Sequence, residues 1–483
     1  MWEWLQDLWP YLVLVVHVAG ATFVTMHVIL RPRQSKALVA WIGLAWFSPV
    51  LGSLTYLCFG INRIERKGAA LGIAESRLGA VAEKPSPAEL ERWKEMAGRH
   101  SSLRGLVQLG SQVTGRKLLP GNKVDPLIDG DEAYPSMLAE IDHAKESVNL
   151  LSYIFDSDRA GEQFLKSLVA AKDRGVDVRV LIDHVGSRYS KPTMVKRLRD
   201  AGVNVASFLP TGKAGFLRFA NLRNHRKILV VDGRVGFTGG TNIREGHCLN
   251  LNPKFPVRCL HFRFEGPVVS HLQEAFANDW AFADGEVLKG PPWFHMNEHV
   301  GEVGARGVSD GPDEDLDKMS EIILGALTAA RHRVMVVTPY FLPDEPVQWA
   351  LAVAAMRGVK IDIVIPKKNN IRLMDWATVP QLSFLLEKGC RVHKSPEPFD
   401  HTKVMLVDGV WSLVGSTNWD PRSLRLNFEY NIECYDEALA ERLEELVNER
   451  IQDAEEVSLE DIEGRSIPVR LRDGISQMFS PYL

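Results

Sequence analysis

The longest apolar stretch of the chain lies near its N-terminus. Residues 10–30 carry no formal charge, and at about 1.5 Å per residue a helix of this length would match the hydrocarbon core of a bilayer. A second apolar stretch covers residues 37–60, after the basic loop RPRQSK. The pattern predicts a two-helix transmembrane hairpin over residues 1–62.

A cleaved signal peptide fits this region poorly. Glu3 and Asp7 precede the first apolar stretch without any Lys or Arg, and no cleavage pattern follows it. The orientation of the hairpin stays open, because basic residues occur both in the loop and after the second stretch. A charged, partly helical linker is expected over residues 63–120.

The rest of the chain repeats one unit of alternating helix and strand patterns. Residues 137–155 and 319–341 each read as an amphipathic helix that runs into an apolar strand, and residues 170–183 and 354–366 each read as a helix end, a Gly and a β-branched strand. The pattern predicts an α/β fold of two homologous α-β-α halves with mixed sheets, over residues 121–300 and 310–483. A pseudo-twofold arrangement would bring equivalent parts of both halves to one site.

Each copy closes on a hairpin pattern that contains unexpected polar residues. The two segments read NHRKILVVDGRVGFTGGTN (224–242) and DHTKVMLVDGVWSLVGSTN (400–418). Both follow H-x-K-x4-D-x6-G-[GS]-x-N. The residues that recur are His225, Lys227, Asp232, Gly239, Gly240 and Asn242 in the first copy, and His401, Lys403, Asp408, Gly415, Ser416 and Asn418 in the second.

The spacing gives these residues a chemical meaning. Residues two apart on a strand point to one face, so each histidine should project beside its lysine. A two-residue Asp-Gly turn would place His225 opposite Gly240 and His401 opposite Ser416, which leaves room for a tetrahedral group. Imidazole, ammonium and the side-chain amides of Asn242 and Asn418 together suit an anionic phosphate.

The aspartates of the motif have a plainer reading. Asp232 and Asp408 belong to the candidate catalytic set by their recurrence, but Asp-Gly is what a tight turn favours. Alternation also places them on the strand face opposite their own histidines. We therefore expect a scaffolding or ion-pair role from them rather than contact with substrate.

Composition narrows the partners and the chemistry. The 483 residues are 45% hydrophobic and carry a net charge of −4, which is typical of a folded chain without a general electrostatic grip on nucleic acid. The five cysteines are scattered and show no zinc spacing. Buried free thiols are the expectation.

The doubled motif closely resembles the signature of the phospholipase D superfamily, and the apolar N-terminus makes the chain similar to the bacterial cardiolipin synthases within it. The resemblance runs from WFSPVLGSLTYLCFG near the N-terminus to FSPYL at the end. It implies a multi-pass protein of the bacterial inner membrane that joins two phosphatidylglycerols into cardiolipin and glycerol, without metal or cofactor. Its partners would be phospholipid substrates and not nucleic acid. The oligomeric state stays open, a homodimer included.

The resemblance also implies roles for the motif residues. His225 would attack phosphorus to give a phosphohistidine, and His401 would act as general acid and then as general base. Lys227, Lys403 and the two asparagines would hold the phosphoryl oxygens. Glu429 occupies the position of a carboxylate that orients a histidine, whereas Cys259 stands where the first half would have an Asp. His225 would then lack its usual orienting partner, so that either another carboxylate serves it or the two histidines are less symmetric than usual.

Three rival functions share some of these features. A phospholipase D-type hydrolase would use the same residues, with water in place of the lipid alcohol. A nuclease would need a basic groove with stacking aromatic residues, which the sequence does not show. A non-catalytic membrane scaffold is disfavoured because both halves keep their His, Lys and Asn residues.

Overall fold

The computed structural model describes residues 2–30, 35–57, 98–210, 222–313, 315–478 and 480. Most of the expected linker and part of FSPYL lie outside the described residues. The helices before residue 58 form one compact unit, and the elements from α6 onward form another. The two units are described separately.

The N-terminal unit contains one helix that is long and apolar enough to cross a membrane. Within α1 (Trp2–Ile29) this stretch covers Leu8–Ile29, and no other helix in the described part of the chain meets the same length and hydropathy. The second apolar stretch forms α2 (Ser35–Phe47) and α3 (Leu51–Thr55). The expectation of a second full transmembrane helix is therefore not confirmed.

The break between α2 and α3 has a local cause. Pro49 has no backbone N–H to donate, and Val50 adopts a positive φ of 57°. The 13 residues of α2 would extend about 20 Å, which is short of the apolar core of a bilayer. Both short helices pack against α1, where His27 Nδ1 and the Tyr56 hydroxyl lie 2.6 Å apart in a hydrogen bond.

The second unit contains the predicted repeat. Its first half alternates helices and strands in the order β1 (Leu119–Ile128), α7 (Asp129–His143), β2 (Ser147–Ser152), α8 (Arg159–Asp173), β3 (Asp177–Asp183), α9 (Met194–Asp200), β4 (Asn204–Phe208), β5 (Arg223–Asn224), β6 (Ile228–Val231), β7 (Val235–Gly239), β8 (Val257–Arg258), β9 (Leu260–Glu265) and α11 (Val269–Asp284).

The second half follows the same order, except that the helix α15 stands where the first half has the strand β8, and it adds three elements at its end. It runs β10 (Val303–Asp310), α12 (Lys318–Ala329), β11 (Arg333–Val337), α13 (Glu345–Met356), β12 (Lys360–Pro366), α14 (Arg372–Glu387), β13 (Arg391–Ser395), β14 (Phe399–Asp400), β15 (Val404–Val407), β16 (Trp411–Gly415), α15 (Pro421–Arg425), β17 (Asn427–Tyr435), α16 (Glu437–Gln452), β18 (Glu455–Glu456), α17 (Leu459–Glu463) and α18 (Ile467–Met478).

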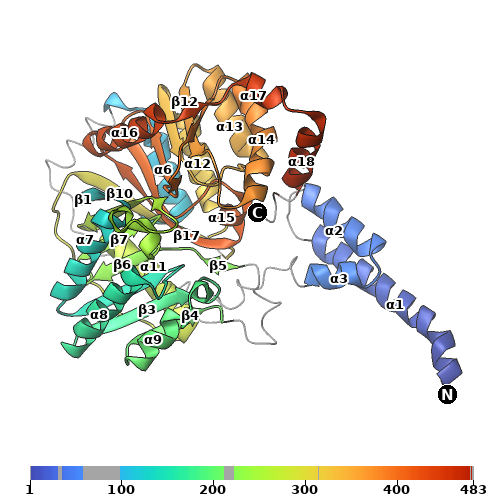
Figure 1. Cartoon of the computed structure of the whole chain (residues 1–483), viewed down its shortest axis with the longest axis horizontal. Helices are drawn as coiled ribbons and strands as arrows, with labels where there is room; N and C mark the ends of the chain where they lie inside the picture. Colours follow the sequence, from blue (N-terminus) through green and yellow to red (C-terminus); the bar gives the residue numbers. More distant parts are fainter. Residues whose placement is uncertain are drawn as a thin grey trace. The chain divides into compact units, whose positions relative to one another are not determined.

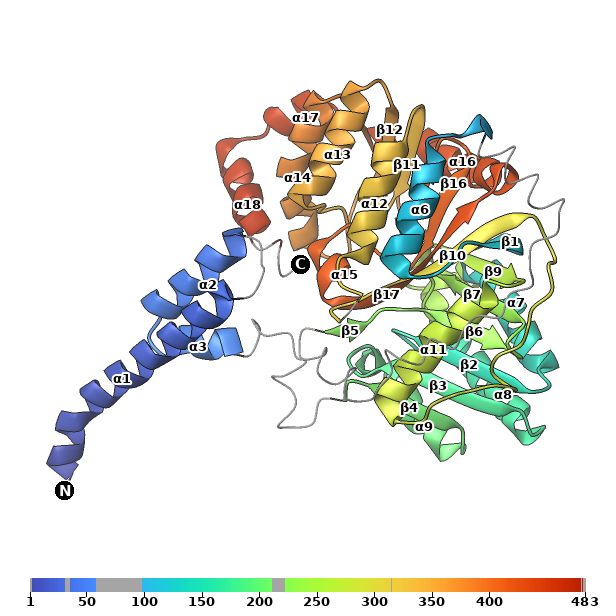
Figure 2. The ribbon, with the colours of Figure 1, turned by 180° about the vertical axis from the view of Figure 1, so that it is seen from behind.

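The two halves share one mixed sheet of 16 strands. β1 and β10 pair antiparallel at its centre, so the sheet of the first half continues into that of the second (Figures 1 and 2). Within each half three strands are parallel (β2, β3, β4 and β11, β12, β13), and the hairpin strands run antiparallel beside them. The predicted mixed α/β fold is confirmed.

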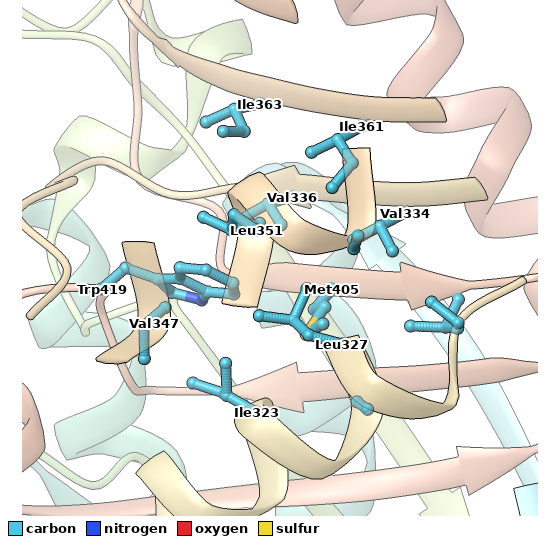
Figure 3. Packing of buried hydrophobic residues seen from close by; sticks show 14 of the residues in the cluster. Ile323, Leu327, Val334, Val336, Val347, Leu351, Ile361, Ile363, Met405 and Trp419 are labelled. Atoms are coloured by element: carbon cyan, nitrogen blue, oxygen red, sulfur yellow. The ribbon is translucent and has the colours of Figure 1, made fainter. Parts of the chain in front are cut away.

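Helices cover both faces of this sheet, and the side-chain alternation shows why. In β2, Leu150 joins the apolar core beneath α7 and α8, while its neighbour Asn149 bonds to Gln273 of α11 on the other face (3.0 Å). The second half has an equivalent core between α12, α13 and the sheet (Figure 3). There Leu351 and Val336 pack with no exposed surface.

Short strands also cross between the halves. β5, directly before His225, pairs in parallel with the start of β17 in the second half. β14, directly before His401, pairs in parallel with β8 in the first half. Each histidine thus follows a short strand that pairs with a strand of the opposite half.

A buried ion pair ties α6 (Leu103–Thr114) to the centre of the sheet. Arg306 of β10 pairs with Glu433 of β17, and both side chains are fully buried. The Arg306 guanidinium also donates to the carbonyl oxygen of Val107 (3.1 Å) and to the Ser111 hydroxyl (2.7 Å) on α6. α6 is therefore part of the second unit rather than a loose linker.

We predict that Glu433→Leu lowers the free energy of unfolding by about 3–5 kcal/mol, because it leaves the buried Arg306 charge without its partner. The matched double variant Arg306→Met/Glu433→Leu should recover most of this loss, since no charge stays buried. Denaturant unfolding of the full-length protein in detergent, followed by Trp fluorescence, measures both. A single variant as stable as the wild type would contradict the assigned role of the pair.

Candidate active site

The two hairpins form as predicted, but their register differs by one residue. Val231 pairs with Val235 and Val407 with Trp411, so each loop has three residues rather than two. His225 and His401 precede β6 and β15 and do not lie opposite Gly240 and Ser416 of their own hairpins. The predicted facing pairs are therefore wrong.

The motif aspartates serve the backbone at each hairpin end. Asp232 has a φ of 51°, and its carboxylate accepts hydrogen bonds from the backbone N–H groups of Lys145, Glu146 and Ser147 at 2.8–2.9 Å. Asp408 accepts three equivalent bonds from residues 331–333. Both aspartates tie a hairpin end to the start of a neighbouring strand and do not line the central cavity. A scaffolding role fits them, and contact with substrate does not.

The crossing strands bring the two histidines close together across the boundary between the halves. The backbone N–H of His225 donates to the carbonyl oxygen of Phe428 (2.9 Å), and that of His401 donates to the carbonyl oxygen of Arg258 (2.8 Å). As a result, the two imidazole rings lie with their centroids 6.4 Å apart and nearly perpendicular. This spacing leaves room for one phosphoryl group between them.

Both rings open into one cavity of about 920 Å³ between the halves. Its lining includes both motif asparagines, Asn242 and Asn418. Basic side chains outnumber acidic ones around it; the basic set is Arg223, Arg244, Lys254, Lys368 and Arg422, and the acidic set is Glu397 and Asp420. The cavity therefore suits an anionic ligand.

Glu429 orients His225 from the opposite half. Both carboxylate oxygens lie 3.0 Å from His225 Nδ1, and Glu429 has no exposed surface. Ser416, Ser423 and Asn427 also donate to this carboxylate. Because a carboxylate only accepts, Nδ1 carries the proton and Nε2 is left as the reactive nitrogen.

Cys259 holds the equivalent position in the first half. The register shows this, because Gly239 pairs with His261 just as Gly415 pairs with Asn431, two residues beyond Cys259 and Glu429 respectively. Its thiol lies 3.4 Å from the carbonyl oxygen of His401. Cys259 thus neighbours His401, not His225.

Of the two alternatives for His225, the structure shows the first: another carboxylate, Glu429 of the second half, serves it. It is His401 whose orienting position holds a thiol, and His401 Nδ1 bonds instead to the carbonyl oxygen of Gly240 (3.0 Å). A carbonyl oxygen also only accepts, so both rings have the same tautomer. The reason is that the orienting position of each half serves the histidine of the other.

Burial shapes the proton affinity of both imidazoles. It lowers the pKa of His225 to about 4, although Glu429 opposes this shift. Burial, Lys403 and Lys227 together hold the pKa of His401 well below its usual value. Burial raises the pKa of the Glu429 carboxyl, but His225 and Lys227 outweigh it and keep that pKa below its usual value. The empty site thus favours two neutral imidazoles beside one carboxylate.

The motif lysines lie behind the histidines. Each Nζ donates to the carbonyl oxygen of its own histidine at 2.6 Å. Burial lowers the pKa of Lys227 to about 7 and that of Lys403 to about 8. An anionic group in the site would raise both values, because it stabilises the charged ammonium.

The small and amide residues of the motif occupy different places. Asn242 accepts a hydrogen bond from the Ile154 N–H through Oδ1 (3.3 Å), which leaves its amide nitrogen to donate. Asn418 donates to the Ser423 hydroxyl (3.1 Å). Gly240 packs tightly, since a Cβ there would lie 2.6 Å from the Cys259 sulfur. Ser416, its counterpart, bonds to Glu429 instead of facing a vacant space.

Sequence reasoning missed three residues of this site. Tyr153 stacks edge-on against His225 (5.0 Å between ring centroids), and Tyr340 does so against His401 (6.4 Å). His247 is buried with its ring 6.3 Å from His401. The tyrosines follow closely on the apolar strands β2 and β11, and this position at a strand end was the available signal.

The described residues contain no group of three or more His, Cys, Asp or Glu side chains placed to hold a metal ion. The chemistry is therefore considered below for these side chains alone.

Two related α/β halves that place one His-Lys set each across a shared cavity define the phospholipase D class of proteins. Comparison with known proteins narrows this class. A family model described as "Cardiolipin synthase, PLD-like domain" matches residues 137–280 and 323–451. The chain belongs to this cardiolipin synthase family, and it is an enzyme of the phosphatidyltransferase type.

Individual relatives cover nearly the whole chain. The cardiolipin synthase of Listeria welshimeri is 30% identical over 99% of this chain and 100% of its own length. The major cardiolipin synthase ClsA of Bacillus subtilis is 31% identical over 93% of this chain and 94% of its own. The phosphatidylserine synthase of Haemophilus influenzae shares the fold, with a TM-score of 0.61 at 15% identity over 79% of this chain and 100% of its own.

We predict that Glu429→Gln lowers kcat by about 10²–10⁴, because the His225 ring loses the carboxylate that orients it and stabilises its positive charge. The same variant should move the acidic limb of kcat/KM to lower pH. An imidazole acts as a nucleophile or a base only when it is neutral, and loss of the Glu429 charge lowers the pKa of His225 further. The rate of phosphatidylglycerol turnover, measured between pH 3 and 8, gives both kcat and the position of the acidic limb. A shift of one pH unit in this limb corresponds to a change of about one unit in the pKa.

Cys259→Ala is the matched control, because it changes the equivalent position of the other half. We expect its kcat to stay within about threefold of the wild type, since a thiol is only a weak hydrogen-bond partner. Equal losses in the two variants would show that Glu429 has no special role at His225.

Proposed function

We propose that this chain joins two phosphatidylglycerol molecules into cardiolipin and glycerol through a phosphohistidine intermediate. The observation that carries the proposal is the pair of facing imidazoles, His225 and His401, of which only His225 bonds to a carboxylate. Membership of the cardiolipin synthase family supports the choice of lipid.

In the first step, His225 Nε2 attacks the phosphorus of one phosphatidylglycerol. The bond between phosphorus and the headgroup glycerol oxygen breaks, and His401 gives its proton to that oxygen as glycerol leaves. Glu429 stabilises the positive charge that develops on the His225 ring. We therefore assign nucleophilic attack to His225.

His401 must carry a proton before this step, although its pKa is low in the empty site. The anionic phosphate of the bound lipid raises that pKa, because it offsets the neighbouring Lys227 and Lys403 charges. Substrate binding itself therefore prepares the acid.

In the second step, His401 takes a proton from the terminal glycerol hydroxyl of a second phosphatidylglycerol. The resulting alkoxide attacks phosphorus, and the bond to His225 breaks to release cardiolipin. Lys227 and Lys403 each have two ammonium protons beyond the bond to a histidine carbonyl, and these hold the phosphoryl oxygens together with Asn242.

The remaining motif residues support this arrangement. Gly240 supplies the carbonyl oxygen that orients His401, and Ser416 positions Glu429. Asn418 lines the cavity beside the phosphate position. Asp232 and Asp408 hold the hairpins in place and stay outside the chemistry.

A phospholipase D-type hydrolase would use the same first step, with water in the second. Two features favour a lipid alcohol as the acceptor. The cavity of about 920 Å³ has more room than one headgroup requires, and its basic side chains come from both halves. One half of the cavity would thus accept the donor lipid and the other half the acceptor.

Vesicles of phosphatidylglycerol with the full-length protein test this reaction. We expect cardiolipin and glycerol in equal amounts by mass spectrometry, and neither product from His225→Ala or His401→Ala. His332→Ala, an exposed histidine outside the cavity, serves as the matched control and should keep full activity. Phosphatidic acid as the sole lipid product would show a hydrolase instead.

The same samples test which histidine is the nucleophile. An alkaline quench preserves phosphohistidine, so a phosphatidyl adduct should appear on the peptide that contains residue 225. An adduct on residue 401 would reverse the assignment.

We further propose that residues 1–62 form a hairpin in the bacterial inner membrane, joined by a linker to the catalytic halves. The linker expected over 63–120 is shorter than predicted at its end, because α6 and the start of β1 at Leu119 already belong to the catalytic unit, and the second half extends over 310–483. α1 supplies one crossing. α2 and α3 supply the second in series, with the break at Pro49 inside the bilayer, because residues 35–55 together approach the length of a span. Oligomeric state, with a homodimer as one option, is left to experiment.

Reporter fusions at the two ends of the chain test this topology. A hairpin places both ends on one side of the membrane, so a phosphatase reporter that works only outside the cytoplasm should respond equally at either end. A response at one end alone would show a single crossing by α1.

A further inference from the structure

The C-terminal helix α18 has its amphipathic pattern reversed. Its exposed face carries Ile467, Leu471, Ile475 and Met478, which are 73%, 61%, 56% and 75% exposed. The face turned inward carries Asp473 and Ser476, which are 1% and 3% exposed. A helix on a protein in water normally buries its apolar stripe, so this face is built to meet an apolar medium.

A polar cavity of about 230 Å³ lies at the inner side of this helix. Lys394 of β13, Arg465 and Arg472 line it, and Asp375 of α14 is the one acidic side chain in its lining. Arg465 and Arg472 hold Asp473 through ion pairs of 2.6 Å, and Arg472 stacks over the Trp376 ring at 4.5 Å. The two guanidiniums are thus fixed in position beside the cavity.

Lys394 is a further basic side chain of this cavity. No hydrogen bond or ion pair of its ammonium occurs within the described part of the chain, although the side chain is only partly exposed. Burial and the nearby Arg465 lower the pKa of Lys394, while Glu455, Asp375 and Asp461 oppose this shift. An anion in the cavity would also oppose it, because it stabilises the charged ammonium.

This cavity adjoins the catalytic one. Asn369 lines both, and α14, which packs along α18, begins directly after Ile371 at the catalytic rim. Ile371 is 44% exposed, as is expected of a rim that meets lipid. Figure 2 shows α18 beside α14 at the edge of the second half. The apolar stripe, the basic cavity and the catalytic entrance therefore belong to one continuous region.

We propose that α18 docks on an anionic bilayer, with its apolar stripe among the acyl chains and one lipid phosphate in the cavity of Lys394, Arg465 and Arg472. This site is separate from the catalytic histidines and binds a lipid without breaking its bonds. It holds the second half against the membrane so that the catalytic entrance stays at the lipid surface. The inference does not depend on which bond the histidines break.

Hydrogen–deuterium exchange of α18 tests the docking. Full-length His225→Ala protein, which leaves the lipid unchanged, is placed in nanodiscs of phosphatidylglycerol or of zwitterionic phosphatidylcholine. We expect residues 467–478 to exchange about fivefold more slowly in phosphatidylglycerol, as one basic side chain at an anionic surface would give. Equal exchange in both lipids would overturn the proposal.

Two further variants separate the cavity from the stripe. Lys394→Gln should reduce the difference between the lipids to less than about twofold. Leu471→Ser/Ile475→Ser should abolish protection in both lipids. Met296→Ser/Val300→Ser, in the first half, replaces side chains of similar exposure (55% and 49%) and should leave α18 protection unchanged.

Other occupants of this face give different results. Protection that survives Leu471→Ser/Ile475→Ser in the discs would show that another part of the chain covers the helix, and protection that rises with protein concentration would show a second copy. Slower exchange on adding inorganic phosphate to phosphatidylcholine discs would show a soluble-anion site. Each result overturns the lipid assignment. Cardiolipin formation is measured separately on the wild type, so failure of the reaction and failure of docking are distinguishable.

Discussion

The exchange of short strands between the halves is the constraint on which the site depends. β5 and β14 contribute only two residues each, yet they place His225 beside β17 and His401 beside β8. The orienting position of each half lies next to these pairings, Glu429 within β17 and Cys259 directly after β8, so it serves the other half's histidine. Neither half could therefore hold an oriented histidine alone, and the continuous 16-stranded sheet fixes the distance between the two.

The duplicated halves have nevertheless diverged at one pair of contacting positions. In the second half Ser416 donates to Glu429, while in the first half Gly240 faces Cys259 so closely that a Cβ would not fit. The two positions thus change together for steric reasons. The outcome is one buried carboxylate among two histidines and two lysines, which leaves an excess of positive charge. A phosphate group bound between the histidines would offset this excess of positive charge.

The sequence patterns predicted those features of the fold that depend on residues close together in the chain. The period-two alternation, the Asp-Gly turns and the internal repeat located the hairpins, the mixed sheet and both histidines. The predicted register was wrong by one residue because each loop has one unpaired residue more than the two of the Asp-Gly turn. The prediction of a second full membrane helix was not confirmed, because the helix breaks at Pro49. The histidine that Glu429 orients could not be predicted, because it depends on the short strands β5 and β14. These strands have two residues each, leave no pattern in the sequence, and pair only with strands of the other half.

The same limit applies to α18, where pattern and environment disagree. Its apolar spacing of four, four and three residues would by itself predict a face packed in the core. In the structure that face points outward, while Asp473 and Ser476 face inward. Asp473 pairs with Arg465 and Arg472, and Arg472 in turn stacks over Trp376 of α14, which holds this side of the helix against the domain. An enzyme whose substrates lie in a membrane gains from this choice, because the charges that fix the helix also line a cavity next to the catalytic entrance. The apolar surface is then exposed where lipid is met.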